Sequence, residues 1–267
     1  MIARIKKYLA DTYIGLVIFF LYAPILVLVV LSFNASKSRS KWGGFTLDWY
    51  RELFSNEEII SALWNTLLIA FLSAAIATVI GTMAAIGMDS MKKKNRSLWM
   101  AITNIPMLNA EIVTGISLML IFMAIGLNKG FLTVLIAHIT FNIPYVILSV
   151  MPKLRQMNIA TYEAARDLGA SPWFAFRKVV LPDLFPGIFS GFLMALTMSM
   201  DDFVITHFTR GASVHTLSTK IYAEVRKGIQ PEMYALSTLL FVSVLILLVI
   251  INIRDSHQEK VRRERNQ

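Results

Sequence analysis

The sequence predicts an all-α, polytopic membrane protein, and three features of its composition and patterning support this fold class. Of its 267 residues, 56% are hydrophobic and 16% are charged, whereas a soluble domain carries about 25% charged residues. The mean hydropathy is +0.60. The apolar residues gather in runs long enough to cross a bilayer, with the charged residues between them. The runs lack the alternating pattern of a barrel, so each is expected to be a helix that satisfies its own backbone.

Six apolar runs predict six transmembrane helices in a single domain, residues 1–267. The runs cover residues 12–33, 62–88, 98–125, 131–151, 185–206 and 235–253. The first follows a basic N-terminus but is too long for a signal peptide, so we expect a retained span. Pro106 is expected to kink or break the third run, which is longer than one span needs. The second run repeats small residues that favour close helix packing: Ala70, Ser73, Ala74, Ala77 and Gly81.

The distribution of Lys and Arg predicts the orientation in the membrane. If the N-terminus lies inside, 17 of the 26 Lys and Arg residues fall in the termini and the inner loops, including the loop at residues 152–184. Cytoplasmic segments carry such an excess, so both termini and this loop are expected in the cytoplasm. The bias also accounts for the net charge of +9, so we expect lipid, and no nucleic acid, as a partner.

Two absences from the sequence limit the chemistry of this chain. It has no cysteine, which excludes disulfides and thiolate metal sites. It also has no G-x-x-x-x-G-K-S/T phosphate loop. We therefore expect no catalytic residues, no metal and no cofactor here, and any ATP and Mg used in transport would be bound by another chain.

A pair of short capped helices is predicted within the 152–184 loop, in the stretch EAARDLGASPWFAFRKVVLP that begins at residue 163. Its first six residues favour a helix. Gly169 follows, and glycine ends helices because it accepts a left-handed backbone. Ser171 and Pro172 supply the N-cap and the first-turn proline of a second helix. Leu181 and Pro182 are expected to close that helix.

This stretch resembles the EAA loop of ABC-importer permeases: EAA, three residues, a glycine, nine residues, and then V-x-L-P. The family prefers Ile where this chain has Val179. In the family the loop docks into a groove of the ATPase subunit, so the resemblance implies a type I ABC-importer permease fold and an ATPase-coupling role for 152–184. The alternative is an ordinary loop with a capped helix pair. The residues that match the motif are Glu163, Ala164, Ala165, Asp167, Gly169, Leu181 and Pro182.

Three acidic residues lie in apolar runs that contain no Lys or Arg: Glu111 in the third run, and the adjacent Asp201 and Asp202 in the fifth. An acid inside a membrane is costly and is by default a functional-site hypothesis. The structural alternatives are a polar partner on a neighbouring helix for Glu111, and a helix end or cap for the Asp pair. Asp202 shares its helical stripe with Ser199 and Thr206, which makes it the better candidate of the pair for a lumen.

Acids without basic partners in the same runs favour a cationic substrate. Trp42, in the first outer loop, could add cation–π contacts to such a substrate, or could belong to the interfacial aromatic belt. His138 in the fourth run is expected to be a satisfied packing residue and is assigned no functional role. A helix at residues 218–225, within the polar segment 207–234, is expected to lie on the outer surface.

Motifs along nearly the whole chain resemble the polyamine (spermidine/putrescine) branch of these permeases. They are FNAS and WGGFTLDWY after the first span, SMDD in the fifth, and KIYAEVRKGIQPE before the last. The chain most resembles the second permease subunit of that system. The resemblance assigns Trp42, Glu111, Asp201 and Asp202 to the polyamine path.

The same resemblance implies the location and the partners of the chain. It implies a multi-pass subunit of the bacterial inner membrane, paired with a homologous permease. A dimer of ATPase subunits would lie below this pair, and an extracytoplasmic polyamine-binding protein above it. The sequence leaves other functions open: a permease for another cationic solute, such as ferric ion or thiamine, a passive channel, or an intramembrane aspartyl hydrolase that uses the Asp pair. Such hydrolases usually combine acids from separate helices, and they would leave the EAA loop unexplained.

Overall fold

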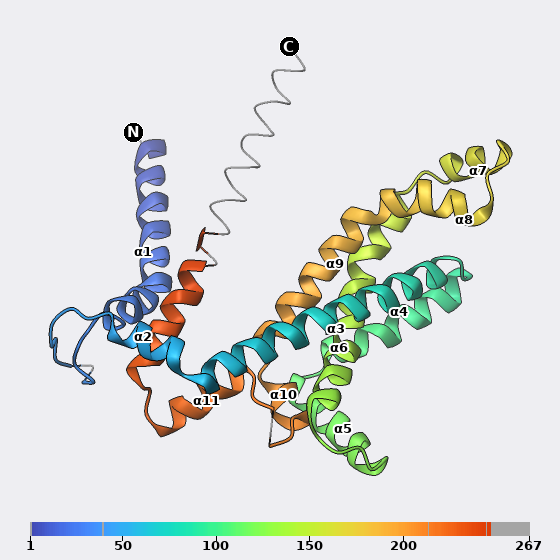
Figure 1. The fold of residues 1–267 in the computed structure, drawn as a ribbon. Helices are drawn as coiled ribbons and strands as arrows, with labels where there is room; N and C mark the ends of the chain where they lie inside the picture. The colour runs from blue at the N-terminus through green and yellow to red at the C-terminus, as the bar shows by residue number, and fades with distance from the viewer. Residues whose placement is uncertain (1, 39, 213, 244, 247–267) are drawn as a thin grey trace. The chain divides into compact units, whose positions relative to one another are not determined.

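The computed structural model describes residues 2–38, 40–212, 214–243 and 245–246, and it is built from helices (Figure 1). The elements are α1 (Ile2–Leu31), α2 (Asp48–Ser55), α3 (Glu57–Asp89), α4 (Lys93–Leu108), α5 (Glu111–Ala124), α6 (Phe131–Gln156), α7 (Ile159–Asp167), α8 (Pro172–Ala175), a π-helical stretch (Phe176–Val180), α9 (Leu181–Asp201), α10 (Val204–Thr209) and α11 (Leu217–Lys227). A further helix covers residues 231–243. Within the described ranges the only extended pairing is one isolated bridge, between Asn34 and Phe45. The all-α prediction is therefore confirmed.

The long helices coincide with the predicted spans. Among the described residues, four helices are long and apolar enough to cross a bilayer, and the pair α4–α5 adds a fifth if it is one broken span. The sixth predicted run, 235–253, starts within the helix over 231–243, and its end lies outside the described residues. The outer helix expected at 218–225 lies within α11.

The third predicted run is broken, as expected from its proline. Helices α4 and α5 meet at an angle of 101°. Pro106 lies in the last turn of α4, where its missing N–H removes one bond of the helix. Directly after α4, Asn109 and Ala110 adopt extended backbone conformations, and α5 then begins.

The described residues group into two compact units. One unit draws on Met1–Ile60 and Ala223–Gln267, and the other on Ser61–Tyr222. The second unit contains α4–α10 and most of α3, and thus the predicted coupling loop and the three membrane acids. The single domain over residues 1–267 stays a prediction.

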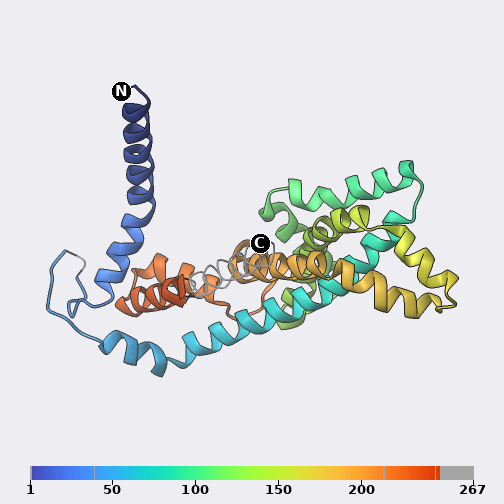
Figure 2. The same ribbon diagram turned by 90° about the horizontal axis from the view of Figure 1, so that it is seen from above.

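The core of the second unit is formed where α6 packs against α3 and α9, which lie beside it in two views at right angles (Figures 1 and 2). Glycines allow the close approach. A Cβ at Gly81 of α3 would lie 2.8 Å from the Cβ of Val146 on α6, and one at Gly191 of α9 would lie 3.2 Å from the Cα of Val146. The small residues predicted to face a neighbouring helix in the second run are all buried, so that packing prediction is confirmed.

In the first unit, the side chain of Asn34 organises the loop that follows α1. Its amide donates to the carbonyl of Lys41 at 2.9 Å and accepts from the N–H of Gly43 at 2.8 Å. The backbone carbonyl of Asn34 accepts a hydrogen bond from the buried indole of Trp49, also at 2.8 Å. One residue thus fixes both ends of a turn whose middle residue is Trp42.

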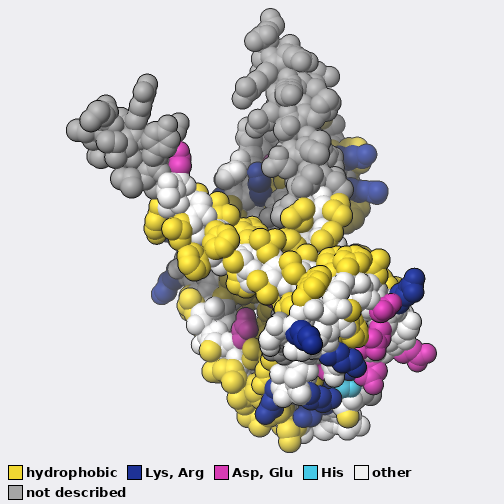
Figure 3. Space-filling model, turned by 90° about the vertical axis from the view of Figure 1, so that its left-hand side faces the viewer, with side chains coloured by type: hydrophobic (Ala, Val, Ile, Leu, Met, Phe, Trp, Pro, Cys, Tyr) yellow, Lys and Arg dark blue, Asp and Glu magenta, His cyan; other side chains and the backbone are white. Residues whose placement is uncertain are grey.

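Much of the molecular surface is apolar, as expected for a protein that meets lipid. Large hydrophobic side chains are exposed along α1, α3, α5 and α9. In a space-filling view, hydrophobic side chains cover broad areas, and charged side chains gather in separate patches (Figure 3). Exposed apolar surface on this scale marks contact with lipid or with other subunits.

Candidate functional site

The predicted coupling knob, residues 163–182 of the loop 152–184, contains two short helices in the structure, α7 and α8. From here on, the knob means α7, the Gly169–Ser171 connection and α8 (residues 159–175), and its first half is a helix closed by glycine. Asn158 caps the start of α7 by accepting from the N–H of Ala160. At its end, Gly169 takes a φ of +86°. The N–H of Ala170 donates to the carbonyl of Ala165 at 3.1 Å, and the N–H of Gly169 to that of Arg166 at 3.0 Å. This pair of bonds is a Schellman motif, which confirms the predicted helix end.

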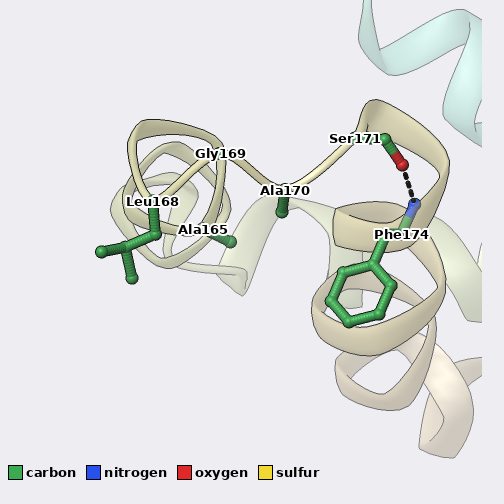
Figure 4. Close-up of a pocket in the computed structure, with 6 residues that line it drawn as sticks. All are labelled: Ala165, Leu168, Gly169, Ala170, Ser171 and Phe174. Carbon is green, nitrogen blue, oxygen red and sulfur yellow. Dashed lines mark hydrogen bonds between the residues drawn. The ribbon is translucent and has the colours of Figure 1, made fainter.

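The second half of the knob also begins as predicted. The hydroxyl of Ser171 accepts a hydrogen bond from the N–H of Phe174 at 3.3 Å, and Pro172 occupies the first turn. Figure 4 shows this N-cap bond, with the Gly169–Ser171 connection between the two helices.

The prediction that Leu181 and Pro182 close the second helix is wrong. Residues 172–201 form one continuous helix that carries the π-helical stretch near its N-terminal end. In this stretch the N–H of Leu181 donates to the carbonyl of Phe176, five residues earlier. A proline in an α-helix clashes with the carbonyl four residues before it. The wider π turn gives Pro182 that room, so the helix continues into α9.

The knob presents an exposed apolar groove. Its volume is about 540 Å³, and Ala165, Leu168, Gly169, Ala170, Ser171 and Phe174 line it (Figure 4). Leu168 is 89% exposed and Trp173 is 70% exposed, which is unusual unless another surface covers them.

The predicted coupling residues fall on two parts of the structure. Glu163, Ala164, Asp167 and Gly169 are exposed on the knob, and Ala165 is half-buried there. Leu181 and Pro182 lie beyond the knob, at the start of α9.

The fifth predicted span ends earlier than expected, at Asp201, and Asp202 begins a new turn. The carboxylate of Asp202 accepts hydrogen bonds from the N–H groups of Ile205 and Thr206, at 3.1 and 2.8 Å, and from the Thr206 hydroxyl at 2.7 Å. Such bonds satisfy the free donors at a helix start. Asp202 therefore caps α10 and breaks the run that the sequence shows as continuous.

His138 of α6 completes a buried polar network around Asp202. Its Nε2 lies 3.3 Å from the Asp202 carboxylate and 2.9 Å from the Thr206 hydroxyl. Its Nδ1 bonds the hydroxyl of Ser199, which lies 3.0 Å from that of Ser73 on α3. The network thus connects α3, α6, α9 and α10. The expectation that His138 is a satisfied packing residue is confirmed, since it is buried and both of its ring nitrogens have partners. Sequence reasoning missed its pairing with Asp202, although an acid and an imidazole in neighbouring spans are a signal for such a pair.

The other two membrane acids, Glu111 and Asp201, are not buried as Asp202 is. Asp201 is exposed at the end of α9. Glu111 is exposed in the first turn of α5, beside a cavity of about 220 Å³ at the α4–α5 break. Ile205 also lines this cavity, so Glu111 and Asp202 both adjoin the first turn of α10.

Trp42 belongs to the other unit. It is 55% exposed and lies between Lys41 and Gly43, the two residues whose backbone groups bond the Asn34 side chain. The assignment of Trp42 and the three acids to a polyamine path stays a prediction.

Several known proteins are similar to this chain in sequence or in fold. The model of the family "Binding-protein-dependent transport system inner membrane component" matches residues 77–263. The spermidine/putrescine transport system permease protein PotC of Escherichia coli is 37% identical over 230 residues, 86% of this chain and 87% of the relative. The putrescine transport system permease protein PotI of Escherichia coli is 38% identical over 232 residues, 84% of this chain and 83% of the relative.

A solved bacterial ABC transporter involved in the import of the acidic polysaccharide alginate has a TM-score of 0.71 at 18% identity. The match covers 96% of this chain and 97% of that one, which shows a shared fold. The chain belongs to the family of binding-protein-dependent transport system inner membrane components, and it has the fold of an ABC-importer permease.

Proposed function

We propose that this chain is a permease subunit of an ATP-driven importer for the polyamines spermidine and putrescine. The observation that carries the proposal is identity of 37% and 38%, over more than four-fifths of each chain, to permease proteins of spermidine/putrescine and putrescine transport systems. Membrane acids without Lys or Arg in the same apolar runs, 98–125 and 185–206, agree with a cationic cargo.

The partners in this proposal follow from the family. A second, homologous permease would complete the translocation path, and an extracytoplasmic binding protein would deliver the polyamine. Two ATPase subunits would bind ATP and Mg on the cytoplasmic side, since this chain has no phosphate-binding loop of the P-loop kind. Both termini and the knob would lie on that same side.

The knob would transmit the ATPase movement to the spans. Its exposed apolar groove and its exposed Leu168 and Trp173 offer a docking surface, and a Schellman turn and an N-cap hold its two helices. Through the continuous helix 172–201, a displacement of the knob would reach the membrane acids at the far end of α9. The spans would need two packings of similar energy, one of which bound substrate favours.

Reconstitution tests the proposed function. The chain would be co-purified with its permease partner, ATPase and binding protein and placed in proteoliposomes, and uptake of labelled spermidine and putrescine would be measured with and without ATP. We expect ATP-dependent uptake, which is lost when the P-loop lysine of the ATPase is replaced. ATP-independent flux would indicate a channel. Uptake of thiamine or ferric ion without polyamine uptake would overturn the proposed cargo.

A further inference from the structure

One face of α4 is apolar and exposed. Leu98, Ile102 and Ile105, the apolar stripe, recur along it at helical spacing and are 60%, 44% and 51% exposed. The opposite face is turned inward, since Met100 packs against the core that α6 forms with α3 and α9. Lys94 lies one turn before Leu98 and is also exposed. The apolar stripe therefore ends, toward the start of α4, in a positive charge.

The positive end of the stripe belongs to a basic segment, Lys92–Lys94, at the start of α4. All three lysines are exposed. The one acid of the α3–α4 connection, Asp89, is held by Arg96 at 3.2 Å. The ion pairs found among the described residues are this one and the His138–Asp202 pair, so neither neutralises a lysine of the segment. The basic segment thus presents three positive charges that the described part of the chain does not balance.

The length of the stripe matches one leaflet of a bilayer. From Lys94 to Ile105 the helix rises about 17 Å, and the hydrocarbon of one leaflet is about 15 Å deep. Trp99, near the basic end, is 49% exposed, and tryptophan is enriched at the depth of lipid headgroups. With the basic segment at headgroup depth, the apolar stripe would therefore lie along the acyl chains.

The two parts of this surface select an anionic amphiphile. Clusters of Lys at the cytoplasmic end of a membrane helix attract anionic headgroups, and the predicted orientation places the basic segment on that side. A soluble anion would pair with the lysines but leave the stripe exposed. A zwitterionic lipid would cover the stripe but bring no net charge to the lysines. An anionic phospholipid supplies both a charged headgroup and acyl chains.

We propose that the basic segment and the apolar stripe of α4 bind one anionic phospholipid, with its headgroup phosphate at the lysines. Topology alone accounts for lysines on the cytoplasmic side, but not for an exposed apolar face that continues from them. Because Met100, on the other face of the same helix, packs into the core, a bound lipid supports the packing of α4 against α6. The site uses no residue of the knob and none of the three membrane acids, so it is independent of the proposed cargo.

Quenching by brominated lipids tests this site. The chain lacks cysteine, so Ala101→Cys, exposed one turn after Leu98, carries a bimane label in a complex whose other subunits have no reactive cysteine. The complex is placed in phosphatidylcholine nanodiscs with increasing fractions of brominated phosphatidylglycerol or brominated phosphatidylcholine. We expect phosphatidylglycerol to bind beside this label roughly three- to tenfold more tightly than phosphatidylcholine.

Charge variants and a matched label position are the controls. Lys92→Gln, Lys93→Gln and Lys94→Gln together should bring the ratio of the two affinities to about one, whereas three Lys→Arg replacements, which keep the charges, should preserve it. The same label at Ser190→Cys, exposed on α9, should show no preference between the lipids. Raising the salt concentration should also weaken the preference at Ala101→Cys, and this measurement needs no charge variant.

Several outcomes would overturn the lipid site. Equal quenching by both lipids at Ala101→Cys, or a preference that survives the loss of the three lysines, would show that the basic segment binds no headgroup. An equal preference at Ser190→Cys would show a general enrichment of anionic lipid around the complex. Little quenching by either lipid at Ala101→Cys would show that another subunit covers the stripe. If the glutamine variant does not assemble, the salt series decides, since a preference that salt leaves unchanged is not due to the lysines.

Discussion

His138 and Asp202 form a buried pair that connects α6 to the turn between α9 and α10. The Nε2 of His138 lies 3.3 Å from the carboxylate of Asp202, and the two side chains are 1% and 3% exposed. The same carboxylate caps the first turn of α10. The geometry indicates that Asp202 acts on the packing of its own chain, while the nearby Asp201 and Glu111 stay accessible.

The first prediction concerns the energetic coupling within this pair. Asp202→Ala should lower the free energy of unfolding by about 3 kcal/mol, because removal of one partner leaves the other buried and unpaired. In a double-mutant cycle, His138→Gln should cost less in the Asp202→Ala background than in the wild type, with a coupling energy of about 1 kcal/mol or more. Thermal unfolding of the detergent-purified complex measures each variant.

Asp201→Ala is the matched control for the cycle. It removes the adjacent, exposed carboxylate, so it should change stability little and show no coupling to His138→Gln. Strictly additive losses for the His138 and Asp202 variants would show that the two side chains do not interact.

The second prediction concerns the glycine that closes α7. Gly169 has a φ of +86°, so Gly169→Ala should destabilise the knob by about 1 kcal/mol or more, while Gly169→Asn should be milder because Asn tolerates this conformation. Gly169→Asp would add a charge to the apolar groove as well. Co-purification of the ATPase and substrate-stimulated ATP hydrolysis should be reduced least by Gly169→Asn, more by Gly169→Ala and most by Gly169→Asp.

The control for this series is Gly87→Ala. Gly87 lies near the end of α3 with helical backbone, and a Cβ there would meet nothing within 4 Å. Alanine at such a position is expected to be neutral or stabilising. If Gly169→Ala and Gly87→Ala leave ATPase attachment and hydrolysis equally unchanged, the knob does not depend on its left-handed turn.

The fold was largely predictable because it depends on local signals. Apolar runs identified the long helices, and Pro106 identified the broken third one. Gly169 and Ser171 correctly marked the end of one short helix and the start of the next. The failure at Pro182 has a physical cause: a proline often ends a helix, but a π turn can accommodate it, and that choice depends on backbone bonds that the sequence does not display.

The candidate site was less predictable because it depends on contacts between distant residues. Asp202 caps α10 within its own run, which was foreseen as one of two structural alternatives. Its partner His138 lies 64 positions earlier in the chain, and the cavity beside Glu111 takes its aromatic wall from α6. Neither pairing follows from helical periodicity, because the sequence does not show which faces of separate helices meet.

The third prediction concerns membrane orientation. The Lys and Arg distribution places the loop after α1 outside and the knob inside. In this cysteine-free chain, Ser38→Cys should react with a membrane-impermeant thiol reagent on intact cells, whereas Ser171→Cys should react only after permeabilisation. Labelling of Ser171→Cys on intact cells would contradict both the orientation and the coupling role of the knob.

The last prediction separates the three membrane acids by their environments. Glu111→Gln and Asp201→Asn remove accessible charges but keep side-chain size, so each should reduce spermidine uptake roughly tenfold while assembly and basal ATP hydrolysis stay normal. Asp202→Asn should act differently: it keeps only one of the two oxygens that accept from the first turn of α10 and loses the charge that faces His138, so its loss of transport should come with lower thermal stability.

The number of amines on the substrate sharpens this test. If Glu111 and Asp201 act at separate points along one path, spermidine, which carries three amines, should lose more transport than putrescine, which carries two, when both charges are removed together. Uptake of the two labelled amines by Glu111→Gln, Asp201→Asn and the double variant measures this difference. Wild-type uptake in all three would refute a cationic path through these acids. Lost assembly in all three would instead make them structural partners between helices, and the polyamine cargo would then rest on sequence identity alone.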